Sequence, residues 1–369
     1  MENSKRTNRV VNRRSLLKSG ALAGSAAALG AGLFAGSTHA SGRESEREPS
    51  RGDIAILRFL AAAELIEADL WTQYAELGGL TSGQPIEVDP NQTLNAYQSA
   101  LSNLDSDGPQ YITSNTLDEV SHATFLNAYL ESRGADPVDL DPFRTLTGSQ
   151  ATGASKIGRL TNLMHLNVDT SWYVRYRSTT NPDFGATFPQ AVKISDRTAI
   201  PITDADLDDA NRIQVIANVA AFHFGYIEQG GASLYQALSQ QVSSPEVLKI
   251  TLGIGGDEIA HFLEWVDFSG NGVQAPVAPV SDAGLTFPNF FNPLNPLIQP
   301  SLIFPVPCEF ISPKLPHCAV IRPSDDRFAG AQATIASFTS DNLFLGQSRL
   351  FFEVVNQLAA EADAAFREF

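Results

Sequence analysis

The chain has 369 residues and a formal net charge of −16, and 43% of its residues are hydrophobic. That length accommodates one large domain or two ordinary ones, with enough apolar side chains for a buried core. Because an acidic surface repels nucleic acid and anionic lipid, neither is an expected partner.

The first 40 residues are predicted to be an export signal rather than part of the core. Arg13 and Arg14 precede Ser-Leu-Leu-Lys and a weakly apolar stretch that ends at Ala40. A positive head, an apolar middle and small residues before a cleavage point are typical of a signal peptide, and the arginine pair resembles a twin-arginine signal. We expect export to the periplasm or the extracellular space and, after cleavage, no membrane contact; a retained anchor is the alternative. The charged residues 41–52 lack apolar periodicity and are predicted to be a disordered leader.

Residues 53–271 are predicted to form an all-α bundle of four long helices with a long crossover between the second and the third. In each helix, apolar residues recur at spacings of three and four. The first helix is expected to end at Gly78 and the second at Gly134, and Pro245 suits the first position of the fourth. Acidic residues that favour the positive end of a helix dipole precede the third helix: Asp204, Asp206, Asp208 and Asp209.

The segments outside the four long helices carry weaker patterns. Two shorter helices are predicted in the connections, at residues 94–104 and 156–177. Residues 272–325 are rich in Pro and Asn with long apolar side chains between them, and they are predicted to wrap the bundle. The last segment, residues 326–369, has helical periodicity and is predicted to be a C-terminal helix.

The chain has two cysteines, Cys308 and Cys318. Two cysteines cannot by themselves build a zinc ribbon or an iron–sulfur site. In an exported protein, a disulfide that closes the short loop between them is favoured. Such a bridge would stabilise the fold by about 2–3 kcal/mol in the chain-entropy model.

Acidic and histidine side chains recur in a fixed order along the apolar faces of the four helices. Glu67 and Glu228 occupy matching positions of the first and third helices, and each is followed seven residues later by a tyrosine, Tyr74 or Tyr235. The second and fourth helices each carry one Glu-x-x-His motif: Glu119 with His122, and Glu258 with His261. One such motif is a weak signal, whereas two, each downstream of a glutamate on the apolar stripe, are a strong one.

This pattern predicts a site for two metal ions. Residues three apart lie on one helical face, so the Glu and the His of each motif can bind the same ion. Burying four carboxylates is costly unless cations neutralise them, and two divalent ions carry the four positive charges required. Di-iron and di-manganese bundles use one Glu from each of two helices and Glu-x-x-His from each of the other two. Glu and His ligands suit iron and manganese alike, so the sequence does not choose between the metals.

Several alternatives stay open. Glu64 competes with Glu67 as the ligand from the first helix, but it lies at the flank of the apolar stripe, and Gly225 occupies the matching place in the third helix. Glu67 is therefore the predicted ligand. Tyr74 and Tyr235 are interpreted as core aromatics whose hydroxyls bond a neighbouring carboxylate. The whole cluster could also be a buried polar network that holds no metal.

The motifs, over about residues 53–271, resemble those of ferritin-like domain proteins, and more narrowly the exported ferritin-like proteins grouped with desiccation-related and stress-response relatives. The resemblance implies a ferritin-like four-helix bundle in which Glu119 and Glu258 bridge the metals and Glu67 and Glu228 each bind one. His122 and His261 would each supply one nitrogen.

The expected function is that of a di-iron or di-manganese protein that handles oxidants or oxidises ferrous iron in stress protection. Its partners would be small oxidants or metal ions. A structural stress or desiccation protein with a non-catalytic metal site is the main alternative, and passive metal sequestration is a third. Fold alone does not decide among them.

Overall fold

Four long helices form the centre of the described part of the chain: α2 (Arg51–Leu77), α3 (Gly108–Ser132), α5 (Ala210–Ser239) and α6 (Pro245–Gly270). The prediction of an all-α bundle with a long crossover is therefore confirmed. The structure, a computed structural model, describes residues 48–78, 94–102, 104, 108–175, 190–270, 280–287, 305–306, 312, 314–316, 318–319 and 329–368.

Shorter elements connect and follow the long helices. The crossover contains η1 (Asp141–Phe143), β1 (Leu146–Thr147), β2 (Gly158–Arg159), α4 (Trp172–Arg175) and η2 (Asp204–Leu207). After α6 come β3 (Val280–Asp282), β4 (Leu285–Phe287), β5 (Pro305–Val306) and β6 (Cys318–Ala319), and then α8 (Ala331–Ser340) and α9 (Arg349–Asp363). The described strands form antiparallel pairs, β1 with β2, β3 with β4 and β5 with β6.

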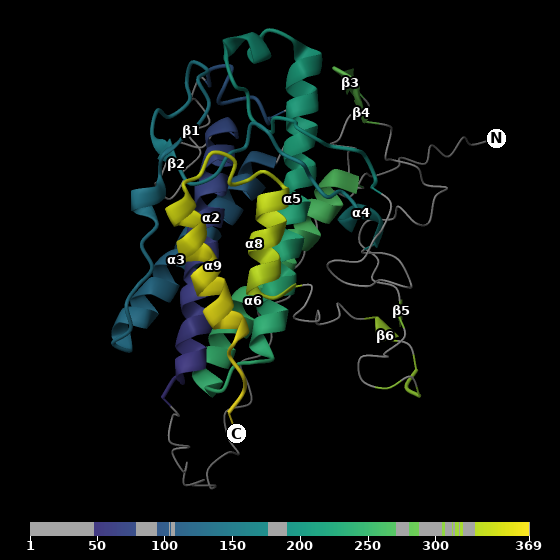
Figure 1. The fold of residues 1–369 in the computed structure, drawn as a ribbon. Coiled ribbons are helices and arrows are strands. Elements are labelled where there is room, and N and C mark those ends of the chain that lie inside the picture. Colours follow the sequence, from purple (N-terminus) through teal and green to yellow (C-terminus); the bar gives the residue numbers. More distant parts are fainter. Residues whose placement is uncertain are drawn as a thin grey trace, which may run out of the picture. The chain divides into compact units, whose positions relative to one another are not determined.

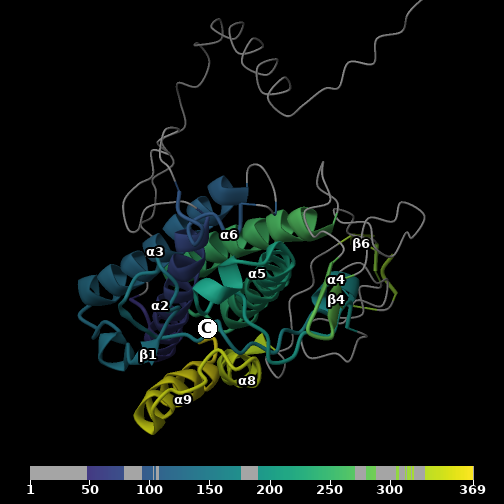
Figure 2. The same ribbon diagram turned by 90° about the horizontal axis from the view of Figure 1, so that it is seen from above.

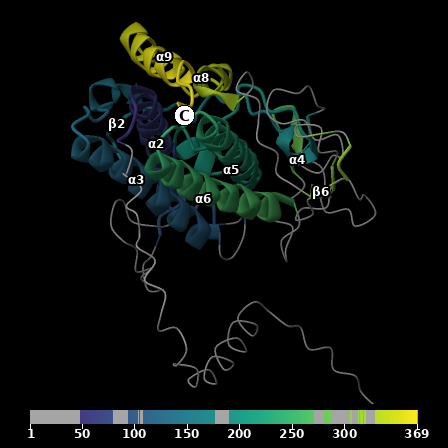
Figure 3. The same cartoon turned by 90° about the horizontal axis from the view of Figure 1, so that it is seen from below.

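The helices lie in three layers (Figures 1, 2 and 3). Helices α2 and α5 form the middle layer, α3 and α6 cover one side of it, and α8 and α9 cover the other. This arrangement explains the burial, because α2 and α5 are covered from both sides and are buried over most of their length. A side chain that points from α3 or α6 toward α2 or α5 therefore enters the interior of the bundle.

Local capping explains where the long helices begin. Ser50 caps α2 with a capping box, in which its hydroxyl accepts from the Asp53 N–H and Asp53 accepts from the Ser50 N–H. Asp53 also accepts from the backbone N–H of Ser243, at 2.8 Å, and so joins the start of α2 to the turn between α5 and α6. Asp209, at the end of the predicted acidic run, caps α5.

The prediction of two shorter helices in the connections is largely wrong. Residues 96–102 form hydrogen-bonded turns, and only Trp172–Arg175 of the segment 156–177 is helical. Helix α2 holds the crossover in an extended path through Asp69, which accepts the backbone N–H groups of Leu160 and Thr161 at 3.0 and 2.9 Å. A backbone N–H bound to a carboxylate is not available to a helix, so these long-range contacts from α2 override the local helical pattern.

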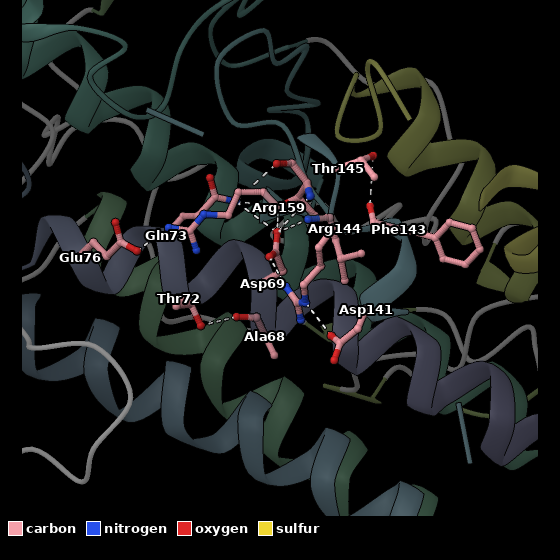
Figure 4. Close-up of polar contacts among 12 residues, drawn as sticks. Ala68, Asp69, Thr72, Gln73, Glu76, Asp141, Phe143, Arg144, Thr145 and Arg159 are labelled. Atoms are coloured by element: carbon pink, nitrogen blue, oxygen red, sulfur yellow. Dashed lines mark hydrogen bonds and ion pairs between the residues drawn. The ribbon is translucent and has the colours of Figure 1, made fainter. Parts of the chain in front are cut away.

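Two arginines strengthen the same attachment (Figure 4). Arg144 donates to the other oxygen of Asp69 at 2.6 Å. The buried Arg159 pairs with Glu76, which lies about two helical turns farther along α2. Each arginine is matched by a carboxylate, so the charges that α2 buries on this side are paired. This face of α2 therefore attaches the crossover, which leaves its opposite face for the bundle interior.

The C-terminal segment differs from the expected single helix. It contains two helices, α8 and α9, which pack against each other and cover α5 and α2. Phe287 of β4 is buried against Phe222 of α5, with ring centroids 5.9 Å apart. This contact agrees with the prediction that residues 272–325 pack on the bundle. Most of residues 272–325, the predicted signal peptide at residues 1–40 and Cys308 lie outside the described residues, so the predicted signal and disulfide stay predictions. Within the described ranges, no helix is both long enough and apolar enough to cross a membrane.

Candidate metal centre

The predicted ligands converge in the middle of the bundle. All six are buried, and Glu119, Glu228 and Glu258 are completely inaccessible to solvent. Helix α3 supplies Glu119 and His122, α5 supplies Glu228, and α6 supplies Glu258 and His261. Helix α2 brings two carboxylates to the same region, the predicted Glu67 and the competing Glu64.

Two four-residue groups have the geometry of a metal site. The first contains Glu64, Glu119, His122 and Glu258, and the second contains Glu119, Glu228, Glu258 and His261. Within each group, one donor atom of every residue lies within 4.8 Å of the others. Glu119 and Glu258 belong to both groups, which is the position of a bridging carboxylate between two ions.

Helix α2 contributes Glu64 to the first group, whereas the sequence pattern favoured Glu67. The Oε2 atom of Glu64 lies 3.3 Å from His122 Nδ1, and the other Glu64 oxygen accepts a hydrogen bond from the Tyr235 hydroxyl. Glu67 is buried one helical turn farther along and belongs to neither group. Its pKa is raised well above the ordinary value, chiefly by burial and then by the charges of Glu119, Glu64 and Glu228.

Glycine on α5 makes room for one of the shared carboxylates. A Cβ atom added to Gly231 would lie 2.0 Å from Oε2 of Glu258, which is far inside van der Waals contact. Leu70 occupies the matching position on α2. The two halves of the bundle are therefore unequal, because α5 leaves space for a bridging carboxylate at a position where α2 carries a side chain.

The two histidines face the carboxylates with the same ring nitrogen. His261 Nδ1 lies 3.1 Å from Glu119 and 3.2 Å from Glu228, and His122 Nδ1 lies 3.4 Å from Glu119. On the far side of each ring, Nε2 lies 3.2 Å from an aspartate of the opposite helix: Asp257 for His122 and Asp118 for His261. A carboxylate that accepts the Nε2 proton fixes the tautomer and presents the Nδ1 lone pair to the cluster.

The sequence interpretation missed these two aspartates. Each directly precedes the glutamate of its Glu-x-x-His motif, so the repeated unit is Asp-Glu-x-x-His in both helices. The presence of an aspartate at the same position of both motifs was the sequence signal that could have identified them. Adjacent residues on a helix point in different directions, and for that reason Asp118 and Asp257 reach the histidine of the neighbouring helix rather than their own group.

Asn115 holds two of the candidate ligands in place. Its amide nitrogen donates to Glu119 at 2.9 Å and to Glu228 at 3.1 Å, while its oxygen accepts from the indole N–H of Trp265 at 2.7 Å. The indole N–H can only donate, so the network fixes which end of the amide faces the carboxylates. Of the two predicted tyrosines, Tyr235 bonds a candidate ligand, whereas Tyr74 contacts His223.

The candidate ligand atoms lack hydrogen-bond partners, which fits a site for metal ions. Among the described residues, several buried atoms in the cluster have no hydrogen-bond partner: Oε2 of Glu64, Glu67, Glu119 and Glu228, both carboxylate oxygens of Glu258, and Nδ1 of His122 and His261. Buried polar atoms in proteins are nearly always bonded, so a concentration of exceptions requires an explanation. Apart from the Glu67 oxygen, all of them belong to the two donor groups and are oxygen or imidazole nitrogen atoms, which suit iron or manganese.

The electrostatics agree with a site built for cations. Burial, followed by the charges of Glu228 and Glu64, raises the pKa of Glu119 to about 8. The pKa of Glu258 is also raised, first by burial and then by Glu119 and Glu67. Burial lowers the pKa of His122, but its contacts with Glu119 and Glu64 outweigh this and raise the value to about 10. Carboxylates that repel one another in a dry interior are the groups that a bound cation stabilises most.

Comparison with known proteins agrees with the fold. Residues 52–263 match the family model of the ferritin-like domain. This match covers more than half of the chain, so the chain belongs to the ferritin-like domain family, and the resemblance to ferritin-like domain proteins is confirmed. Neither the curated proteins nor the solved structures give a match to the chain.

Proposed function

We propose that this protein binds two iron or manganese ions between α2, α3, α5 and α6 and uses them to react with dioxygen or peroxide. The observation that carries the proposal is the membership of Glu119 and Glu258 in both donor groups. In the proposed centre, Glu64 and His122 would hold one ion, Glu228 and His261 would hold the other, and the two shared glutamates would contribute to both.

The charges of the proposed centre balance. Four carboxylates, Glu64, Glu119, Glu228 and Glu258, oppose the four positive charges of two divalent ions. Glu67 is a fifth buried carboxyl group outside both donor groups, and burial and the neighbouring carboxylates raise its pKa. A neutral Glu67 leaves the balance intact, whereas an ionised one would add an uncompensated buried charge.

The surrounding residues suit chemistry with a small oxidant. Bound iron or manganese would supply changes of redox state and coordination positions open to dioxygen or peroxide. The chain holds the ligands in place through Asn115 and the Tyr235 hydroxyl. Leu70, Leu126 and Ile254 are buried in the bundle core and exclude water, which favours redox chemistry over hydrolysis.

The assignment of Glu64 is testable against its neighbour on the same helix. We expect Glu64→Gln to lower the metal content from two ions per chain toward one, because an amide is a weaker ligand than a carboxylate and His122 loses its charged partner. Glu67→Gln, the matched control, should keep both ions, since Glu67 is outside both donor groups. Elemental analysis of the purified variants decides between them. Loss of an ion in Glu67→Gln with retention in Glu64→Gln would restore the assignment favoured by the sequence.

The reactivity is tested with the loaded protein. We expect the reduced iron form to oxidise rapidly on mixing with dioxygen, or the manganese form to consume peroxide. His261→Ala should slow either reaction, because the second ion loses its nitrogen ligand, while circular dichroism shows retained helices. Stopped-flow absorbance and peroxide consumption measure the two reactions. A fully loaded protein that is no faster than free ions in both assays would support the alternative of a metal that only stabilises a stress protein.

We also propose that the protein is exported through the twin-arginine route, as the Arg13-Arg14 pair suggests. That route carries folded proteins, so metal could be loaded in the cytoplasm before export. Changing both arginines to lysine should trap the precursor in the cytoplasm, as judged by fractionation and immunoblotting. Unchanged export of the double-lysine variant would contradict the proposal.

A further inference from the structure

A line of aromatic side chains runs from the candidate metal centre to a buried tyrosine. The Trp265 indole donates to Asn115, whose amide donates to the candidate bridging ligand Glu119. Trp265 stacks on Trp71 with ring centroids 5.4 Å apart and an interplanar angle of 20°. Trp71 in turn contacts the edge of Tyr74, with centroids 5.7 Å apart. Successive rings in contact are close enough for an electron to pass from one to the next.

The last ring of this line is bonded to a buried proton acceptor. The Tyr74 hydroxyl lies 2.6 Å from Nδ1 of His223, and Nε2 of the same ring lies 3.0 Å from Asp341. All three side chains are buried. A carboxylate accepts the Nε2 proton, so the network assigns the lone pair to Nδ1 and makes the Tyr74 hydroxyl the donor.

The three aromatic residues differ in what happens to their protons. The Trp71 indole N–H has no hydrogen-bond partner among the described residues, and the Trp265 N–H faces a neutral amide oxygen, which is a very weak base. An oxidised indole at either position therefore has no base to take its proton. Tyr74 has the His223 imidazole at hydrogen-bond distance. Oxidation at Tyr74 can therefore be coupled to proton transfer, which makes Tyr74 the favourable end of the line.

We propose that Trp265, Trp71 and Tyr74 form an electron-transfer path that delivers one electron from Tyr74 to the metal centre after dioxygen or peroxide has oxidised that centre. The Tyr74 O–H bond breaks, and its proton forms an N–H bond at His223 Nδ1. The resulting imidazolium faces the Asp341 carboxylate, and a neutral tyrosyl radical remains. The metal centre is reduced by the one electron that Tyr74 loses. The path thus gives the centre one electron beyond those of its own ions.

Packing around the path supports a fixed geometry. Phe224 contacts all three rings, with centroid distances of 4.9 Å to Trp71, 4.7 Å to Tyr74 and 4.7 Å to Trp265. Asp341 terminates α8, so that helix completes the proton acceptor. This gives the C-terminal helices, which lie outside the family match at residues 52–263, a role in the chemistry of the bundle.

The proposal rests on the proposed redox function, so the loaded protein is tested with two separate readouts. After the reduced iron protein is mixed with dioxygen or peroxide and frozen, electron paramagnetic resonance should show a tyrosyl radical whose spectrum narrows with ring-deuterated tyrosine. Tyr74→Phe and Trp71→Phe should lose this signal, and Tyr173→Phe, the control, should keep it. Oxidation of the metal without any tyrosyl signal in the wild type would overturn the path and leave the metal function standing. Absence of metal oxidation would instead overturn the proposed function.

The path is also tested without metal. Trp172→Phe leaves Trp71 and Trp265 as the two tryptophans of the chain, and the described aromatic contacts of Trp172 are with Tyr173, Phe222 and Phe262. After photoionisation of the metal-free Trp172→Phe protein, the tryptophan radical should decay into a tyrosyl radical. Adding Tyr74→Phe should abolish that conversion, while an unchanged circular dichroism spectrum shows that the helices are retained. Equal conversion in both proteins would overturn the path whatever the metal does.

Discussion

Glu258→Ala is expected to remove both metal ions from the protein. Glu258 belongs to both donor groups, so each ion loses a ligand and an opposing charge in one substitution. Metal content after loading and desalting should fall from two ions per chain to a small residual fraction, as measured by elemental analysis. Glu264→Ala, on the same helix, serves as the matched control, since Glu264 is exposed and outside both groups; it should keep both ions.

The loss of metal in that variant should not reflect loss of the fold. Both carboxylate oxygens of Glu258 are buried without hydrogen bonds, and Glu119 and Glu67 repel its charge. Removing such a group from the metal-free protein relieves an unfavourable interaction. Glu258→Gln, which keeps the side-chain volume, should therefore melt at or above the temperature of the metal-free wild type. A metal-free Glu258→Gln protein that melts well below the wild type would show that the carboxylate stabilises the fold without metal.

Removal of metal is expected to destabilise the wild-type protein strongly. An ion that binds only the folded state contributes about 4 kcal/mol per site when its free concentration is a thousandfold above its Kd. Two filled sites would therefore raise the free energy of unfolding by a large fraction of the total stability of an ordinary domain. Thermal melts of loaded and chelator-treated protein measure the difference. Identical melting temperatures would mean that no ion binds the folded state preferentially.

This difference in stability should grow as pH rises from about 5 to about 8. The folded-state pKa of Glu119 is about 8, above its ordinary value of 4.5, because burial and the charges of Glu228 and Glu64 disfavour its ionised form. A carboxyl group whose pKa is higher in the folded state than in the unfolded state holds its proton more tightly in the folded state. The stability that this gives is complete at pH values below the unfolded-state pKa and is lost as pH rises through the folded-state pKa. Each such group costs the metal-free fold up to about 1.4 kcal/mol per pH unit in that window.

Histidine changes the stability of the metal-free protein in the same direction as pH rises. The pKa of His122 is raised to about 10, so the stability that its protonated form gives to the metal-free protein is lost as pH rises through that value. Metal must displace these protons, so its apparent affinity increases with pH. The metal-free protein should lose stability over pH 5 to 8 while the loaded protein keeps it. Parallel pH profiles for the two forms would contradict the carboxylate cluster as the source of the effect.

The sequence predicted most of the bundle because its helices carry strong periodic patterns. The two Glu-x-x-His motifs placed Glu119, His122, Glu258 and His261 correctly on the inner faces of α3 and α6, since residues three apart share a helical face. The segment 156–177 was not predictable in the same way. Its extended path depends on Asp69, a residue distant in sequence whose carboxylate binds two of its backbone N–H groups.

The choice between Glu64 and Glu67 depended on treating the two halves of the bundle as equivalent. The structure breaks that equivalence at two positions. A Cβ atom on Gly225, which matches Glu64, would lie 2.4 Å from the ring of Trp172, a residue of the crossover. Gly231 approaches Glu258, whereas Leu70 stands at the matching position of α2. Such differences in three-dimensional packing are not visible in residue spacing.

Anomalous X-ray scattering from crystals of the metal-loaded protein tests the central claim most directly. We predict two peaks inside the bundle, one beside Glu64 and His122 and the other beside Glu228 and His261, with Glu119 and Glu258 between them. A single peak, or no peak among these residues in crystals of protein shown by elemental analysis to carry metal, would contradict the two-metal centre.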